Sequence, residues 1–305
     1  MPPTRLPIIG YPVAPTPLDG VLRAAFEEVG AGLVIEPMEL RPHQLADGLS
    51  RLRADDAVAG ALIAAPHKEK ASLLCDALSD DARVSGTVNL LVRSDGRLKG
   101  HNTDADGIRA GLEAILPRVK GKWPRNAMVL GAGGGARAVV AVLIGSGFQH
   151  IVVLNRHLHR AEALVAHFTR RAHHLELRAR PWHDAIIEAE LSRAELLVNA
   201  SGVGTEREES AIPDELMADG RYVLDLVLER AETPLMAAAR QRAGTVSNGH
   251  DSFLAASAST VALLTGRTPS ADILLNALTA EVAVPSEEVA AAGPRWDDAS
   301  SVAIR

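Results

Sequence analysis

The sequence predicts an α/β protein with two units, an N-terminal α/β unit and a Rossmann-type, doubly wound unit. Short apolar runs alternate with amphipathic segments in two successive series along the chain, as expected for strands and for the helices that cover them. In the second series, the glycine-rich run from Gly131 to Gly135 joins an apolar strand to an Ala/Val-rich segment. This order of strand, glycine turn and helix is typical of a dinucleotide site.

The first series ends in a hairpin. Ser94, Asp95 and Gly96 separate two apolar runs, and an Asp-Gly turn favours two antiparallel strands. Cys75 falls within the third expected helix, where its apolar neighbours predict a buried thiol; it is the only cysteine, so the chain offers it no disulfide partner. The expected strands are residues 6–9, 32–35, 60–64, 87–93 and 97–99, and the expected helices are 18–29, 43–54 and 69–78.

The second series follows a helix expected at 105–116 and a polar loop at 117–125. A strand at 128–130, a helix at 134–145 and a strand at 151–154 form a β-α-β unit of the expected length, about 30 residues. A glycine-rich turn that binds nothing is the alternative, and the flanking strands and helix argue against it. The remaining expected strands are 175–179, 196–199 and 222–227, and the remaining helices are 233–242 and 252–264.

These elements suggest two domains. We expect residues 1–105, completed by residues from about 250 to 280, to hold a substrate, and residues 106–249 to hold the dinucleotide. Ligands of α/β sheets bind at the carboxyl ends of the strands, so the site is expected in a cleft between the two domains. Residues 286–305 are polar and irregular, and we expect a loosely ordered tail.

Each residue of the glycine run has an expected task. Gly131 permits the tight turn, and Gly133 lets backbone N–H groups approach a pyrophosphate. Ala136 keeps the helix close to the strand, so that the positive end of the helix dipole faces the phosphates. The expected cofactor contacts here are Gly131, Gly133, Gly134, Gly135 and Ala136.

The end of the following strand favours NADP over NAD. NAD-binding units carry a carboxylate there for the ribose 2′-hydroxyl, whereas this chain has Asn155 and Arg156, with Arg160 one turn into the next helix. The fork of donors on a guanidinium matches a 2′-phosphate. A solvated loop arginine is the alternative for Arg156.

The composition limits the function classes. The net charge of −6 argues against an extended nucleic-acid surface, and the 11 histidines do not gather at metal-ligand spacing, so no metal site is expected. No charged-then-apolar leader and no apolar run of about 20 residues is present, so neither export nor a membrane span is expected. We therefore expect a cytoplasmic protein whose partner is a small-molecule substrate.

Short segments in a fixed order carry a resemblance to a known family. The chain contains Pro66-His67-Lys68-Glu69, Gly86-Thr87-Val88-Asn89, Gly100-His101-Asn102-Thr103-Asp104, the glycine run at 131–137, Asn155-Arg156, Asn199-Ala200-Ser201, and Asp225-Leu226-Val227 with Thr233-Pro234-Leu235. In order and spacing these segments resemble the shikimate dehydrogenase family over residues 6–275. Any one of them is weak evidence, but the collinear set is specific.

The resemblance implies reversible hydride transfer between NADP and a secondary alcohol on a small carboxylated ring, within aromatic amino acid biosynthesis. It implies that Lys68 and Asp104 are the catalytic pair, since the alcohol proton must pass to and from a base. It further implies that Asn89 contacts a substrate hydroxyl and that Asn199 belongs to the cofactor site. A plain surface ion pair is the alternative for Lys68 and Asp104.

The chain departs from the family pattern at the expected substrate contacts. The family has two serine hydroxyls that grip the substrate carboxylate, where this chain has at most Thr16; Ala64, Leu228 and Ala256 stand in place of a threonine, a tyrosine and a glutamine. Three interpretations follow: a dehydrogenase with a substrate other than shikimate, which we favour; a shikimate or quinate dehydrogenase; and a non-catalytic dinucleotide-binding or regulatory homologue.

Overall fold

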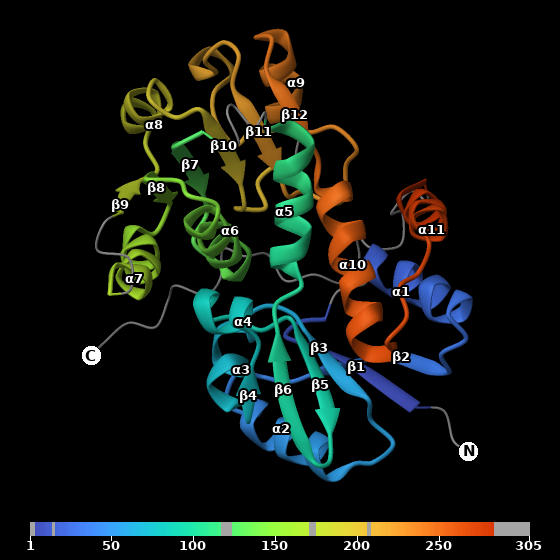
Figure 1. Ribbon diagram of the computed structural model, residues 1–305. Coiled ribbons are helices and arrows are strands. Elements are labelled where there is room, and N and C mark those ends of the chain that lie inside the picture. Colours follow the sequence, from blue (N-terminus) through green and yellow to red (C-terminus); the bar gives the residue numbers. More distant parts are fainter. Residues whose placement is uncertain (1–3, 14–15, 117–123, 171–174, 206–208, 284–305) are drawn as a thin grey trace.

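The structure, a computed structural model, describes residues 4–13, 16–116, 124–170, 175–205 and 209–283. It contains two six-stranded sheets, one above the other in Figure 1, with helices on both faces of each. We call the part built on the first sheet the first half and the part built on the second sheet the second half. The tail at 286–305 and most of the loop at 117–125 lie outside the described residues.

The first sheet is mixed. Its strand order is β2-β1-β3-β5-β6-β4; β1 pairs in parallel with β2 and β3, and the hairpin β5–β6 adds antiparallel to β3. The hairpin turns at Asp95 and Gly96, which have φ values of 50° and 70°, as the Asp-Gly pair predicts. The strands are β1 (Thr4–Gly10), β2 (Leu33–Glu39), β3 (Gly60–Ile63), β4 (Ala77–Leu78), β5 (Leu90–Ser94) and β6 (Arg97–His101).

Both ends of the described chain contribute helices to the first half. Side chains alternate along each strand, so Ile8 faces α1, α10 and α11 while Ile9 faces α2 and α4. The residues after the second sheet therefore complete the first half. These helices are α1 (Pro17–Glu28), α2 (Leu45–Ala54), α3 (Lys68–Leu74), α4 (Asp80–Ser85), α10 (Gly249–Thr265) and α11 (Ala271–Ala283).

The second sheet confirms the doubly wound prediction. Its order is β12-β11-β10-β7-β8-β9 and every pair is parallel, with two layers of helices around it. The order reverses between β7 and β10, and this is where such sheets bind their ligand. The elements are β7 (Asn126–Leu130), α6 (Gly134–Gly145), β8 (His150–Asn155), α7 (Leu158–Thr169), β9 (Glu176–Pro181), α8 (Asp184–Leu191), β10 (Leu196–Asn199), a 3-10 turn at Asp214–Leu216, β11 (Tyr222–Asp225), α9 (Pro234–Gln241) and β12 (Thr245–Ser247).

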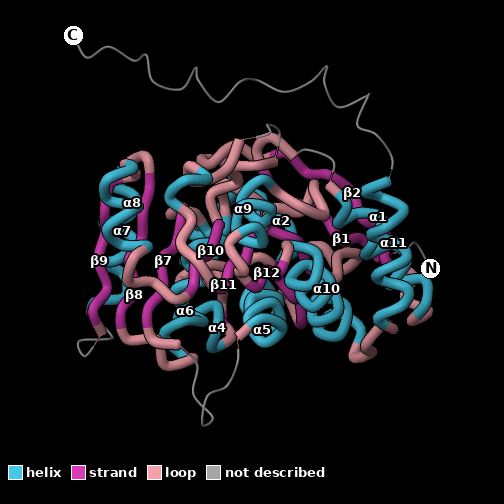
Figure 2. The backbone as a smooth tube through the Cα atoms, turned by 90° about the horizontal axis from the view of Figure 1, so that it is seen from above, coloured by secondary structure: helices cyan, strands magenta, loops and turns pink. Residues whose placement is uncertain are grey.

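Two long helices connect the halves. α5 (Asp104–Ile115) leads from the first sheet to the second, and α10 leads back and packs against it; in the view from above, both lie near the middle of the molecule (Figure 2). Small residues let them approach: a Cβ on Gly107 would overlap the carbonyl oxygen of Ser252, and one on Gly111 would lie 2.5 Å from the Ser252 hydroxyl. The two connections form one packed pair.

The prediction for residues 69–78 was wrong in its last part. α3 ends at Leu74, and Cys75 is a half-buried residue at the cap instead of a buried helical thiol. Asp76 accepts a hydrogen bond from the backbone N–H of Leu98 at 2.8 Å, and the short strand β4 pairs with β6. Sheet pairing competes with the helix here and prevails. In the described ranges, no helix is long and apolar enough to cross a membrane.

Candidate active site

The end of β3 and the start of α3 fix Lys68. It is the first residue of α3, and its carbonyl oxygen accepts a hydrogen bond from the N–H of Val88 at 2.9 Å. The preceding His67 is buried, and its Nε2 donates to the carbonyl oxygen of Leu40 at 2.6 Å. The backbone of Lys68 is therefore tied on two sides, while its side chain reaches out of the helix.

Lys68 and Asp104 are brought together from distant parts of the chain. The Nζ of Lys68 lies 2.6 Å from Oδ2 of Asp104, and the two side chains are only 25% and 26% exposed. Asp104 is the first residue of α5, where the helix dipole favours a carboxylate. The partial burial distinguishes the pair from an ordinary surface ion pair.

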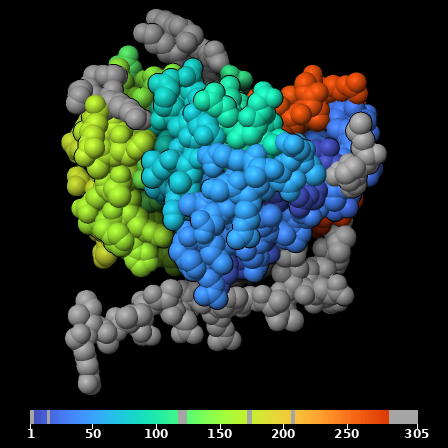
Figure 3. Space-filling model, turned by 90° about the horizontal axis from the view of Figure 1, so that it is seen from below, coloured from blue at the N-terminus to red at the C-terminus, as the bar shows by residue number. Residues whose placement is uncertain are grey.

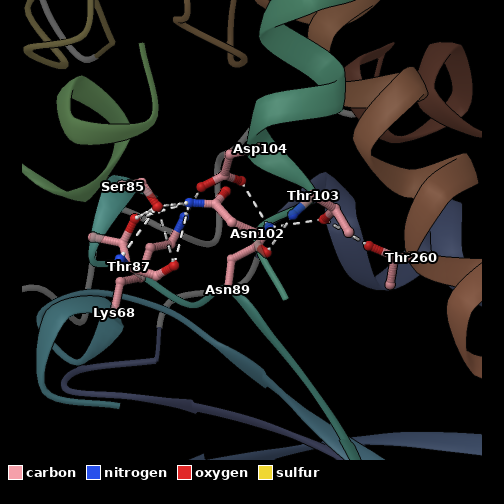
Figure 4. A network of polar contacts seen from close by, with 8 residues as sticks. All are labelled: Lys68, Ser85, Thr87, Asn89, Asn102, Thr103, Asp104 and Thr260. Carbon is pink, nitrogen blue, oxygen red and sulfur yellow. Dashed lines mark hydrogen bonds and ion pairs between the residues drawn. The ribbon is translucent and has the colours of Figure 1, made fainter. Parts of the chain in front are cut away.

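Asn89 holds the carboxylate of Asp104 in place. Its Nδ2 donates to Oδ1 of Asp104 at 2.8 Å and to the hydroxyl of Thr103 at 2.9 Å, and its Oδ1 accepts from the N–H of Thr103 at 2.8 Å (Figure 4). Both amide hydrogens of Asn89 are therefore used in hydrogen bonds within the protein. The group that Asn89 can offer to a substrate is the remaining lone pair of Oδ1.

Behind the pair lies a buried polar network that the sequence did not single out as a site. Asn102 donates from Nδ2 to the hydroxyls of Ser85 and Thr87, at 2.9 and 2.8 Å, and the hydroxyl of Thr103 contacts that of Thr260 on α10 at 3.0 Å. Asn102 and Thr103 stand in the segment that carries the family resemblance. No feature of the sequence pointed to Thr260.

The glycine turn of the second half has an open backbone. Gly131 has a φ of +107°, and a Cβ there would lie 2.5 Å from the carbonyl oxygen of Ala200; Gly133 caps α6 without any side-chain hydrogen bond. A Cβ on Gly133 or Gly135 would meet no atom within 4 Å. The N–H groups of the first turn of α6 are therefore approachable from outside, and Ala136 is buried against the strand as expected. These features fit a dinucleotide pyrophosphate.

The site for the 2′-phosphate expected at the end of β8 has two cations and no carboxylate. Asn155 ends the strand and donates from Nδ2 to the carbonyl oxygen of His157 at 3.0 Å. Arg156 and Arg160 follow, both exposed, and neither forms an ion pair within the described ranges. Two such guanidinium groups beside the turn are suited to a phosphate.

Asn199 shapes a loop in this structure. It is buried; its Nδ2 donates to the carbonyl oxygen of Val203 and to Asp225, and its Oδ1 accepts from the N–H and hydroxyl of Ser201. Asp225 is also buried and accepts from Thr233 at 2.6 Å. Burial raises the pKa of the Asp225 carboxyl, against the hydrogen bonds it accepts. Asn199 therefore orders residues 199–203, together with its buried partner Asp225, which the sequence did not mark as a site residue.

The expected substrate contacts are mostly apolar. Thr16 caps α1, is exposed, and makes no hydrogen bond to Lys68, Asn89 or Asp104. Ala64 and Leu228 pack with Val13, Leu18 and Phe253 against one apolar cluster, and Ala256 lies against Gly107 of α5. Among the described residues, no group of His, Cys, Asp and Glu could hold a metal ion.

The two halves meet at the site. A Cβ on Gly134 would lie 3.1 Å from Cδ of Lys68, so the stem of Lys68 packs on the glycine turn. A lysine–carboxylate pair directly beside a glycine turn of this type is the arrangement expected in a pyridine-nucleotide-dependent oxidoreductase.

Comparison with known proteins names the family. Residues 8–91 match the shikimate dehydrogenase substrate binding domain, and residues 115–217 match the shikimate / quinate 5-dehydrogenase domain. The shikimate dehydrogenase (NADP(+)) of Geobacter metallireducens is 34% identical over 270 residues, which cover 88% of this chain and 93% of the relative. The chain belongs to the shikimate dehydrogenase family.

Solved structures agree. The shikimate 5-dehydrogenase of Thermus thermophilus, in complex with NADP(H) and shikimate, is similar with a TM-score of 0.75 and 31% identity, over 91% of this chain and 99% of that one. A 5-ketofructose reductase of a Gluconobacter species, in its ligand-free form, has a TM-score of 0.76 over 91% and 98% of the chains at 23% identity, which shows a common fold alone.

Proposed function

We propose that this protein transfers hydride reversibly between NADP and a secondary alcohol on a small carboxylated ring, and that the ring carries fewer hydroxyl groups than shikimate. The first half, residues 1–105 with about 250–280, would hold the ring, and residues 106–249 would hold NADP in a cleft between them. The observation that carries the proposal is the Lys68–Asp104 pair, partly buried against the glycine turn.

NADP would be held by the glycine turn and by the two exposed arginines after β8. The N–H groups at the start of α6 would bind the pyrophosphate, and Arg156 with Arg160 would bind the 2′-phosphate. Asn155 would border the adenosine, and Asn199 would act through the loop that it orders. When bound, the nicotinamide supplies or accepts the hydride.

Lys68 would move the proton. In reduction, its ammonium group donates a proton to the carbonyl oxygen of the substrate, and in oxidation the neutral amine takes the proton from the hydroxyl group. Asp104 holds Nζ of Lys68 through Oδ2, and Asn89 holds the other oxygen of the carboxylate. The carboxylate therefore keeps one orientation while the charge on Lys68 changes.

The apolar residues at the family's substrate-contact positions support the choice of substrate. A polyhydroxylated ring beside Ala64, Leu228 and Ala256 would lose hydrogen bonds that the family's polar side chains provide, at about 1 kcal/mol or more each. Where the family has two serines that bind the substrate carboxylate, this chain offers the hydroxyl of Thr16, which lies next to residues outside the described ranges.

Shikimate or quinate oxidation is the second candidate, favoured by the names of the relatives and by the shikimate-bound structure from Thermus thermophilus. A spectrophotometric panel decides: shikimate, quinate and less hydroxylated cyclic hydroxy acids, each with NADP and with NAD. We expect NADPH formation with a less hydroxylated acid at a higher kcat/KM than with shikimate. Highest kcat/KM for shikimate would establish the second candidate, and no turnover of any alcohol with retained NADP binding would establish the non-catalytic interpretation.

A further inference from the structure

We propose that Glu69 and Arg137 tie the two halves together and are positioning residues that hold Lys68 beside the dinucleotide turn. This inference rests on the proton-transfer role proposed for Lys68. Neither residue is assigned any contact with the substrate.

The two residues come from helices of different halves. Glu69 follows Lys68 in the first turn of α3, and Arg137 lies in the first turn of α6. Nη2 of Arg137 is 2.9 Å from Oε2 of Glu69. Lys68 itself packs on Gly134, so two successive residues of α3 touch one turn of α6. A shift between the helices would move Lys68 away from the site of hydride transfer.

The pair is unequally buried. The side chain of Arg137 is 11% exposed and that of Glu69 is 51% exposed, and Nε of Arg137 is buried without a hydrogen-bond partner in the described residues. Loss of Glu69 would leave a largely desolvated guanidinium unpaired, which costs more than breaking an exposed ion pair. Both charges would be hydrated if the halves separated, so the pair stabilises only the arrangement in which they touch.

A second contact lies on the same border. Nε2 of His167, on α7, is 3.0 Å from the carbonyl oxygen of Val84, on α4, and α4 packs against α6. Seen from below, the blue and cyan first half lies directly against the yellow-green second half (Figure 3). Glu69 and Arg137 form the ion pair on this border that stands next to Lys68.

The test compares Glu69→Gln, Arg137→Gln and the double variant with the native protein. Glu232→Gln is the matched control, because Glu232 is also 51% exposed and pairs with an arginine, Arg240, within the second half alone. Hydrogen–deuterium exchange of the peptides over α3 and α6 measures whether the two helices are held together, and this measurement does not depend on catalysis. Turnover at saturating NADP, with the alcohol that the native protein accepts, reports the position of Lys68.

We expect Glu69→Gln to raise exchange in the first turns of α3 and α6 and to lower kcat by about 3- to 10-fold, with KM changed less. The double variant should be no worse than Arg137→Gln, since both remove one interaction. The control should resemble the native protein, and circular dichroism should show that all variants are folded. Unchanged exchange and kcat in Glu69→Gln would overturn the tie while the proposed function stands; full turnover by Lys68→Ala would overturn the proton-transfer role of Lys68 whatever the exchange shows.

Discussion

Nζ of Lys68 and Oδ2 of Asp104 are 2.6 Å apart although 36 positions separate the two residues in the sequence. The contact joins the first residue of α3 to the first residue of α5. Neither residue has another ion-pair partner among the described residues, so each fixes the other.

Lys68→Ala should lower turnover by about 10²- to 10⁴-fold, because it removes the proposed proton-transfer group. Its binding constant for NADP, from fluorescence titration, should stay nearly native, since the proposed phosphate contacts are all in the second half. Asp104→Ala should act in the same direction. The double variant should lose little more than either single one, because the pair acts as a unit; losses that simply add would show that the two act independently.

Arg156→Ala should weaken NADP binding by about 1–3 kcal/mol and leave NAD binding nearly unchanged, since the guanidinium is expected to contact only the 2′-phosphate. Dissociation constants for both cofactors measure this. Arg51→Ala is a suitable control, because Arg51 is an exposed arginine on α2 in the first half. Equal affinity of the native protein for NADP and NAD would refute the assignment.

Gly131→Ala and Gly133→Ala should fail in different ways. At Gly131 the positive φ and the contact with Ala200 make a methyl group costly, and we expect a stability loss of about 1–3 kcal/mol in urea unfolding. At Gly133 a Cβ meets open space, so stability without NADP should be native while NADP binding weakens. A destabilised Gly133→Ala would show that this turn is more crowded than the structure indicates.

Asp225→Asn should change how stability depends on pH. The folded pKa of Asp225 is raised above the ordinary value of 3.8 by burial, so the folded protein holds this proton to higher pH than the unfolded chain. Its contribution to stability therefore falls as pH rises from about 3.8 through the folded pKa, and is constant above it. The free energy of unfolding of the native protein minus that of the asparagine variant should therefore be smaller at pH 7 than at pH 4.5. Asp219→Asn, at an exposed carboxylate, is the matched control variant.

Leu228→Tyr combined with Ala256→Gln should raise kcat/KM for shikimate, because the two side chains restore hydroxyl and amide groups of the family pattern. About 30-fold is expected for two hydrogen bonds at about 1 kcal/mol each. Initial rates with shikimate and with the best substrate of the native protein measure the shift. An unchanged ratio would show that these positions do not select the substrate.

Local patterns predicted most of the fold, and distant contacts account for what was missed. The glycine turn, the hairpin at Asp95 and Gly96, and most strands follow from short-range signals. α4 was not predicted. Its capping residues Ser79 and Gly86 are present in the sequence, but the helix between them is short. α8, β12 and α11 depend on their packing partners in the complete structure.

The sequence predicted which residues of the candidate site lie together better than it predicted the hydrogen-bond partners of each residue. Lys68, Asp104 and the glycine turn lie together as the resemblance implied. Asn89 and Asn199 were expected to contact ligands, which stays a prediction; in this structure their amide nitrogens donate to neighbouring backbone and side-chain groups. Which partner an amide takes depends on side chains up to 26 positions away, and local sequence does not encode this.

The packing of α10 and α11 on the first sheet has a consequence for synthesis of the chain. Leu6, Ile8, Leu62 and Leu90 share one apolar cluster with these two helices, yet the whole second sheet lies between them in the sequence. On the ribosome, β7 to β12 can therefore be complete while the first sheet still shows part of that face to water, where chaperones or other nascent chains can bind it. The half that would hold the substrate is the first to be synthesised and the last to complete its folding.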